Sequence, residues 1–220
     1  MNIDYSEKLK THLAEESELY PRNDIGIARL FYDIHREQIC YVVESKSWYA
    51  YDGRRWVKDE GGLSVMEHCK GFAQALARFA EANDDGSEKI KAFVKYATGF
   101  HGRKRREGLL SDARSVAPKS LADFDRGMML LNCWNGTLDL KESVLKPHRA
   151  EDYITKLARV KYVQTASCPR WNSFINEVMC DDADTAVFLQ KALGYVLTGD
   201  TSLECFLSCT ATQRAMEKQH

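Results

Sequence analysis

The chain has 220 residues, with 31 Lys or Arg against 32 Asp or Glu and a formal net charge of −1. A protein that wraps DNA by charge is usually basic, because released counterions supply most of that affinity. The balanced charge excludes a general DNA-coating protein, so any contact with DNA must be local. The apolar fraction of 44% supports a folded core and excludes extended disorder.

No apolar run approaches the roughly 20 residues that cross a bilayer, so we expect no membrane partner. The polar, acidic start MNIDYSEKLKTHLAEESE is unlike a signal peptide. The seven cysteines form no Cys-x-x-Cys pair and stand at positions 40, 69, 133, 168, 180, 205 and 209. The odd count and irregular spacing predict reduced thiols and a cytoplasmic location.

The first 60 residues predict two helices and a small sheet. An amphipathic helix over residues 1–20 has Leu9 and Leu13 on one face. After a break at 21–24, Asp24 is expected to cap a short helix. That helix carries apolar residues at helical spacing, which are Ile27, Leu30, Phe31 and Ile34. The β-rich runs that follow, Ile39 to Val43, Trp48 to Tyr51 and one around Trp56, predict an antiparallel meander.

The middle of the chain changes to a helical period. Apolar residues recur every three or four positions over 64–100, with a break at 83–87. A basic run follows at 102–106, and then another helical stretch near 109–116.

From Leu130 the pattern is strand-like again, and we expect a hairpin that turns at 141–143. Residues 152–163 are expected to add an extended segment. Pro169 begins a helix, and Asp182 or Asp184 caps a last one. These elements predict an α+β fold: a small antiparallel β meander near the N-terminus, then a mainly helical domain with a β-hairpin and C-terminal helices.

The basic run is the first candidate binding site. Its residues, which cations of this kind would use to grip DNA phosphates, are Arg103, Lys104, Arg105 and Arg106. The alternative is a solvated loop between two helices. No aromatic residue interrupts the run, so it does not predict a platform for stacking single-stranded bases.

Aromatic residues are densest between Tyr41 and Trp56, on the predicted strands. One face of that sheet could stack bases. The alternative is that these rings fill the core of a small sheet, which is the commoner use of large aromatic side chains.

Two acidic clusters are candidate metal sites. Asp123 and Asp125 resemble the paired aspartates that hold Mg²⁺ in polymerase-type primases, but their flanks indicate loop or capping roles. The run at 181–184 lacks the glycine and glutamate of a calcium loop, so helix capping explains it. The six histidines stand apart, which predicts no zinc site. No catalytic residue is assigned.

Several blocks of the sequence, in order and spacing, resemble the domain that precedes the superfamily-three helicase in phage/plasmid and poxvirus-type DNA primase–helicases. The blocks are NDIGIARLFYDIHREQICYVVESKSWYAYDGRRW (23–56), LLNCWNGTLDL (130–140), LKPHRAEDYITKLARVKY (145–162), CPRW (168–171) and FLQKALGYVLTGDTSLECF (188–206). The resemblance covers residues 23–207. We expect an N-terminal helix at 1–22, a small β-rich entry module at 23–60 and a pre-helicase domain of this type at 61–207. In the intact family, priming and DNA unwinding depend on ATP and Mg²⁺.

The resemblance implies a Walker A loop after the strand at 204–207, but this chain continues SCTATQRAMEKQH without a glycine. If the coding sequence is read out of register, so that one codon joins the last base of the Met216 codon to the first two bases of the Glu217 codon, that codon must encode glycine. A Walker-type loop is one of the sequences that this shifted frame can encode. The hypothesis is that 208–220 is an out-of-frame tail of a prophage or plasmid relic. Resequencing the locus tests it, and an adjacent frame without helicase-like coding would exclude it.

The sequence therefore predicts an N-terminal fragment of a replication primase–helicase, with no ATPase activity and no cofactor of its own. Its expected partners are DNA and intact helicase subunits. The alternatives are a DNA- or helicase-subunit-binding module without catalysis, or an inert prophage remnant. Because the strand at 204–207 would lack a sheet to join, ending the chain near Gly199 is expected to improve solubility.

Overall fold

The computed structural model describes residues 3–13, 19–179 and 182–204. The chain divides into two compact units, and the division is not sequential. The first unit contains residues 1–126 and 149–155, and the second contains 127–148 and 156–220. The segments predicted at 1–22, 23–60, 61–207 and 208–220 stay a prediction, and the tail at 208–220 lies outside the described residues.

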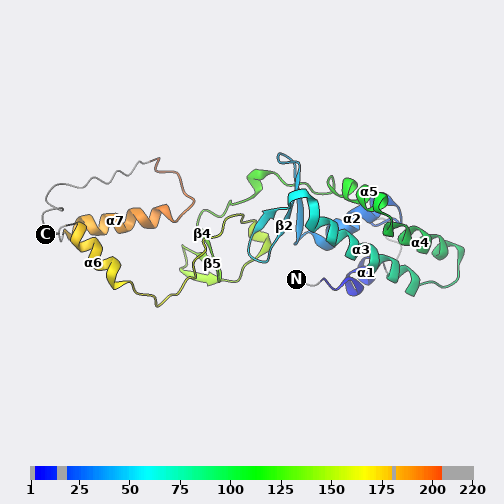
Figure 1. The fold of residues 1–220 in the computed structure, drawn as a ribbon, viewed down its shortest axis with the longest axis horizontal. Helices are drawn as coiled ribbons and strands as arrows, with labels where there is room; N and C mark the ends of the chain where they lie inside the picture. The colour runs from blue at the N-terminus through cyan, green and yellow to red at the C-terminus, as the bar shows by residue number, and fades with distance from the viewer. Residues whose placement is uncertain (1–2, 14–18, 180–181, 205–220) are drawn as a thin grey trace. The chain divides into compact units, whose positions relative to one another are not determined.

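The described residues form seven α-helices and two three-stranded antiparallel sheets (Figure 1), so the α+β prediction is confirmed. The helices of the first unit are α1 (Tyr5–Leu13), α2 (Asp24–His35), α3 (Leu63–Ala82), α4 (Glu88–Thr98) and α5 (Arg103–Ala113). Its strands are β1 (Ile39–Val42), β2 (Ser47–Tyr51) and β3 (Trp56–Lys58). The second unit contains β4 (Leu130–Cys133), β5 (Gly136–Asp139), β6 (Val144–Lys146), α6 (Pro169–Val178) and α7 (Ala183–Val196).

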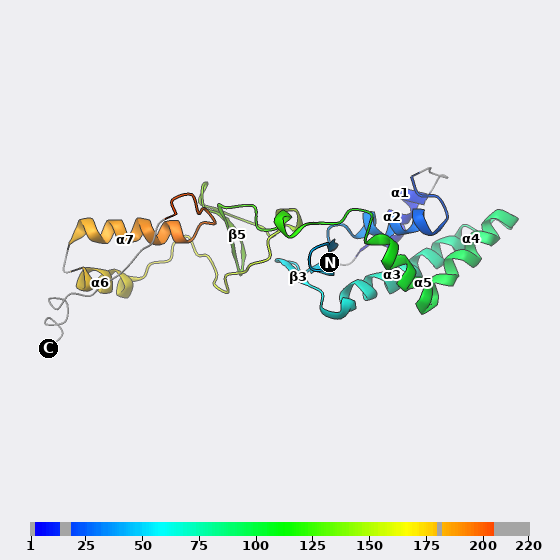
Figure 2. The ribbon, with the colours of Figure 1, turned by 90° about the horizontal axis from the view of Figure 1, so that it is seen from above.

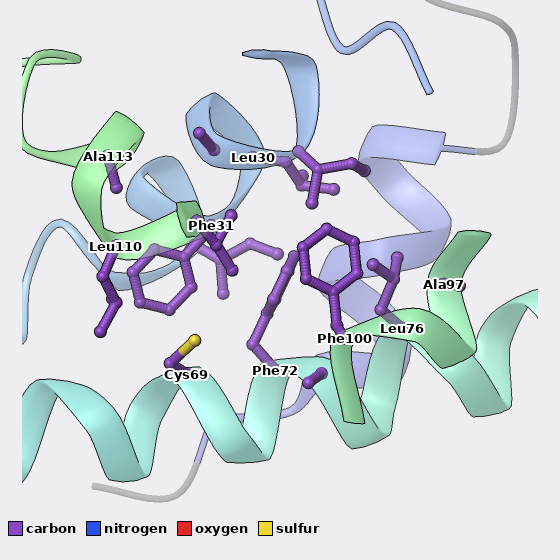
Figure 3. Close-up of a cluster of buried hydrophobic side chains, with 14 of the residues drawn as sticks. Leu30, Phe31, Cys69, Phe72, Leu76, Ala97, Phe100, Leu110 and Ala113 are labelled. Atoms are coloured by element: carbon purple, nitrogen blue, oxygen red, sulfur yellow. The ribbon is translucent and has the colours of Figure 1, made fainter. Parts of the chain in front are cut away.

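The core of the first unit lies between its helices. The long helix α3 runs alongside α4 and also contacts α1, α2 and α5 (Figures 1 and 2). Phe31 of α2, Phe72 of α3 and Phe100 after α4 meet at the centre of this cluster (Figure 3). Each of these rings is at most 1% exposed. Burying a side chain of this size contributes about 1.5–3 kcal/mol, so the three rings hold the helices together.

Helix α2 begins one residue earlier than the sequence predicted. Asn23, rather than Asp24, is the N-cap, and its side chain accepts a hydrogen bond from the amide of Gly26 at 3.0 Å. Asp24 is instead the first helical residue, where its negative charge suits the positive end of the helix dipole. The apolar face predicted at 27–34 is buried, as is the predicted face of α1.

His35 is a fully buried polar residue at the end of α2. Its Nδ1 lies 2.7 Å from the carbonyl oxygen of Phe31, so this nitrogen carries the proton, and its Nε2 accepts from the Tyr5 hydroxyl at 2.9 Å. Burial lowers the pKa of His35 to about 3. The residue is therefore a neutral histidine that ties α1 to α2.

The predicted β meander is confirmed, with strand order β1-β2-β3. Because neighbouring strand residues face opposite sides, Ile39 joins the helical core while Cys40 joins a second cluster around Trp56. The segment 149–155 closes this second cluster. The Trp56 indole donates to the carbonyl of Ala150 at 2.8 Å, and the Trp56 amide donates to the carbonyl of Ile154 at 2.8 Å.

The second sheet has one more strand than the predicted hairpin. The expected turn at 141–143 joins β5 to β6, but Trp134 and Asn135 make an earlier turn between β4 and β5. Gly136 ends that turn at φ 153, with the β6 backbone close against its Cα. The segment 152–163 forms no strand among the described residues, although its backbone donates to Asn132 of β4 and accepts from Trp134 in the turn after β4.

Helices α6 and α7 occur where the sequence predicted them. Pro169 opens α6, and Asp182 caps α7 by accepting from the amides of Asp184 and Thr185. The described residues of both helices are all at least partly exposed. The strand expected at 204–207 falls largely outside the described residues. The expected gain in solubility from ending the chain near Gly199 depends on that strand and stays a prediction.

Candidate nucleic-acid interface

The predicted basic run forms the first turn of α5 rather than a loop between helices. Gly102 is the N-cap and offers no side chain to the free amides, and no acidic residue lies in the first turn. The amino end of a helix carries a positive partial charge, so cations placed there are unfavourable by roughly 0.3–1 kcal/mol each. The four cations and the helix dipole together produce a region of positive potential, which a bound anion would partly neutralise.

Arg105 is held against the helical core. Its Nη1 donates to the carbonyl of Tyr96 at 3.0 Å, and its guanidinium lies over the rings of Tyr96 and Phe100 at 4.3 and 5.1 Å. Gly99 leaves the space that this requires, because a Cβ there would lie 2.3 Å from Arg105 Nη1. Arg105 is therefore half-buried, and its contacts stabilise the packing of α5 against Tyr96 and Phe100.

Arg106 is also half-buried. Its Nη1 donates to the carbonyl oxygen of Phe100 at 3.0 Å and to that of His101. These bonds close η2 (Gly99–His101), the short helical turn that joins α4 to α5. The buried Nε of Arg106 finds no hydrogen-bond partner within the described ranges. Arg106 is therefore fixed in place by its bonds to the turn before α5.

Arg103 and Lys104 are the two members of the run that project into solvent. Within the described part of the chain Arg103 makes an i,i+4 pair with Glu107, at 2.8 Å, and no other ion pair, and its side chain is 84% exposed. An exposed pair of this kind contributes at most a few tenths of a kcal/mol. Both side chains can turn to an approaching phosphate at little cost, so they are the residues of the run best placed for binding.

Two hollows flank the first turn of α5. One, of about 480 Å³, is lined by Lys104 and Arg105 but also by Asp24 and Asp112. The other, of about 560 Å³, lies against α3 and is lined by a more basic set: Lys70, Ala73, Gln74, Ala77, Arg78, Glu81, His101 and Arg106. The sequence reasoning missed the α3 residues. The four-residue spacing of Lys70, Gln74 and Arg78 places them on one helix face but does not distinguish that face from a solvated one.

The aromatic residues of the meander are largely core residues. Trp48 is 5% exposed and Trp56 is 1% exposed, which confirms the core interpretation for both tryptophans. Tyr49 and Tyr51 are half-buried and pack against the second cluster. Burial raises the pKa of Tyr51 to about 12. This sheet therefore offers no row of open rings for base stacking.

The aspartates at 123 and 125 hold loops, as expected. Asp123 closes a capping box with Ser120, and Asp125 accepts from the Thr155 amide at 2.8 Å and from its hydroxyl. Throughout the ranges that the structure describes, no group of three or more His, Cys, Asp or Glu residues could hold a metal ion.

Fold and site together define an α+β protein with two small sheets and a basic helix terminus that could contact nucleic acid. A family model described as D5 N terminal like matches residues 28–180, more than half of the chain. The chain belongs to this family, which forms the domain N-terminal to the superfamily-three helicase in phage and poxvirus primase–helicases. The predicted family is thereby confirmed.

No curated protein matches the chain. Among the described helices, none is both long and apolar enough to cross a bilayer.

Proposed function

We propose that this chain is a DNA-contacting domain of a replication primase–helicase and that it hydrolyses no ATP by itself. Its family membership supports a role in priming and unwinding. The observation that carries the proposal of DNA contact is the exposed pair Arg103 and Lys104 at the amino end of α5. Cations at such a terminus bind phosphate with charge, helix dipole and free amides acting together.

The contact is expected to be weak and salt-sensitive. Basic and acidic residues balance over the whole chain, so no long-range attraction adds to the local one. Two phosphate contacts contribute about 1.8 units to the slope of log affinity against log salt on duplex DNA. The domain would therefore hold DNA firmly only alongside other parts of a larger assembly.

The proposal of no ATPase activity rests on the sequence. The 220 residues contain no glycine-rich loop with the lysine that meets the β- and γ-phosphates. Binding at α5 needs neither ATP nor Mg²⁺. The rival proposals are a module that binds intact helicase subunits instead of DNA, and an inert prophage remnant.

The test is fluorescence anisotropy of a labelled duplex at several salt concentrations, with the Arg103→Ala/Lys104→Ala double variant. The matched control is Arg159→Ala/Lys161→Ala, which removes two exposed cations from the second unit. We expect the α5 variant to bind more weakly and to lose about two units of salt slope, with the control unchanged.

Equal binding by the wild type and the α5 variant would refute DNA contact at this site. Pull-down of an intact family helicase, without DNA binding, would favour the subunit-binding alternative. Neither interaction would favour the remnant. Release of phosphate from ATP by the purified chain would contradict the proposed absence of ATPase activity.

A further inference from the structure

The more basic of the two hollows, which we call the α3–α5 groove, has a volume of about 560 Å³. One wall is the exposed edge of α3, where Lys70, Gln74 and Arg78 follow one another at four-residue spacing. His101 of η2 and Arg106 of α5 line it as well. All five side chains belong to the first unit, so the groove depends on one compact body.

Small residues form the inner surface of the groove. Ala73 and Ala77 of α3 line it and are only 1% and 2% exposed. Both lie one turn apart, beneath the edge that carries Gln74 and Arg78. Longer apolar side chains at these two positions would fill the space, so the hollow follows directly from the sequence of α3.

Charge in the groove is strongly one-sided. Lys70, Arg78 and Arg106 face a single carboxylate, that of Glu81. Lys70 pairs with Glu67 at 2.5 Å, but both side chains are about half exposed or more, so the pair contributes little. Arg78 has no ion pair or hydrogen bond in the described part of the chain. Its five donors are therefore available to a ligand.

Arg106 makes the site partly preorganised. Its bonds to the carbonyls of Phe100 and His101 fix the guanidinium before any ligand arrives. A fixed donor loses little conformational entropy on binding. Arginine also matches phosphate oxygens with two parallel hydrogen bonds, which gives it an advantage over lysine for this ligand.

We propose that the α3–α5 groove is a second phosphate-binding site of this domain. Phe, Tyr and Trp are absent from the residues that line the groove, and His101 is its single ring, so the groove has no platform for a row of stacked bases and its cations favour phosphate. Lys70 and Arg78 are eight residues apart, or about 12 Å along the helix. That length suits several phosphates of one strand, and a free nucleotide offers the same chemistry. The choice of DNA as the source rests on the function proposed above.

The test compares Arg78→Ala with Arg29→Ala. Both remove one exposed arginine from a helix of the first unit, but Arg29 does not line the groove. With a labelled DNA duplex, Arg78→Ala is expected to lower the affinity several-fold and the salt slope by about one unit. Arg29→Ala should do neither. Arg78→Lys should recover part of the affinity, because it restores the charge without the bidentate geometry.

Identical binding by the Arg78→Ala and Arg29→Ala variants, with DNA and with a nucleoside triphosphate alike, would overturn the groove proposal. Arg78-dependent binding of DNA identifies the backbone as the source, and Arg78-dependent binding of the triphosphate alone identifies a free nucleotide. If Arg78→Ala weakens DNA binding but the Arg103→Ala/Lys104→Ala variant does not, the function assigned to α5 fails and the groove stands. The reverse pattern overturns the groove alone.

Discussion

Replacing Arg105 by alanine should destabilise the first unit, whereas replacing Arg103, two residues away, should not. The Arg105 side chain is 39% exposed, so its remaining surface is in contact with the protein. Its hydrogen bond to the Tyr96 carbonyl is worth about 1 kcal/mol after allowance for solvent. Each of its two ring contacts adds roughly 0.5 kcal/mol. The pair with Asp24, at 3.8 Å and exposed, adds almost nothing.

The free energy of unfolding is therefore expected to fall by about 2 kcal/mol for Arg105→Ala and by less than about 0.5 kcal/mol for Arg103→Ala. Urea unfolding followed by far-UV circular dichroism measures both. Arg105→Lys should recover less than half, because an ammonium group cannot reproduce the planar contact with Tyr96. Equal unfolding midpoints for the two alanine variants would refute the division of the run into fold-supporting and solvent-facing members.

Gly136→Ala should lower the free energy of unfolding by roughly 2–3 kcal/mol, because its φ is 153 and a Cβ would lie 2.6 Å from a β6 carbonyl oxygen. Gly108→Ala, in an open position on α5, should instead raise the free energy of unfolding by up to about 1 kcal/mol, and thermal melts of both variants measure the difference. Because burial lowers the pKa of His35 to about 3, the unfolded chain takes up this proton first as the pH falls below 6.5. Stability should then drop by up to about 1.4 kcal/mol per pH unit, and a His35→Gln variant that kept the full slope in urea titrations would contradict this. Exposed Cys168 should react with iodoacetamide in the native protein, while Cys69, whose pKa burial raises to about 12, should react only after unfolding; peptide mapping by mass spectrometry distinguishes them.

Hydrophobic spacing predicted the helices and strands that bury one face against the core. The period of α2 placed Leu30 and Phe31 in the core, and the β-rich runs placed Trp56 on a strand, because burial itself produces those patterns. The sequence did not predict the start of α5, because its first turn has no buried apolar residues to produce a hydrophobic period. Its first turn holds only charged residues, and the contacts of Arg105 and Arg106 with the preceding turn are tertiary.

The α3–α5 groove could not be predicted from local pattern. Lys70 and Arg78 at helical spacing look like any solvated helix face. Only the return of the chain through η2 against α3 converts that face into one wall of a basic hollow. The early turn at Trp134 and Asn135, by contrast, has a local signal, because Asn135-Gly136 is a pair typical of tight hairpin turns.

The bond from Trp56 to Ala150 spans 94 residues of sequence and sets an order of events during synthesis. When residue 126 has left the ribosome, the helices of the first unit are complete, but the Trp56 indole still lacks its acceptor. The second sheet must be made next, as an insertion between 127 and 148, before 149–155 can close the cluster. Until then the Trp56 indole can donate only to water, and its ring lacks the cover that Tyr153 supplies in the complete fold. The nascent first unit is therefore exposed to misfolding or chaperone binding for the time needed to translate these residues.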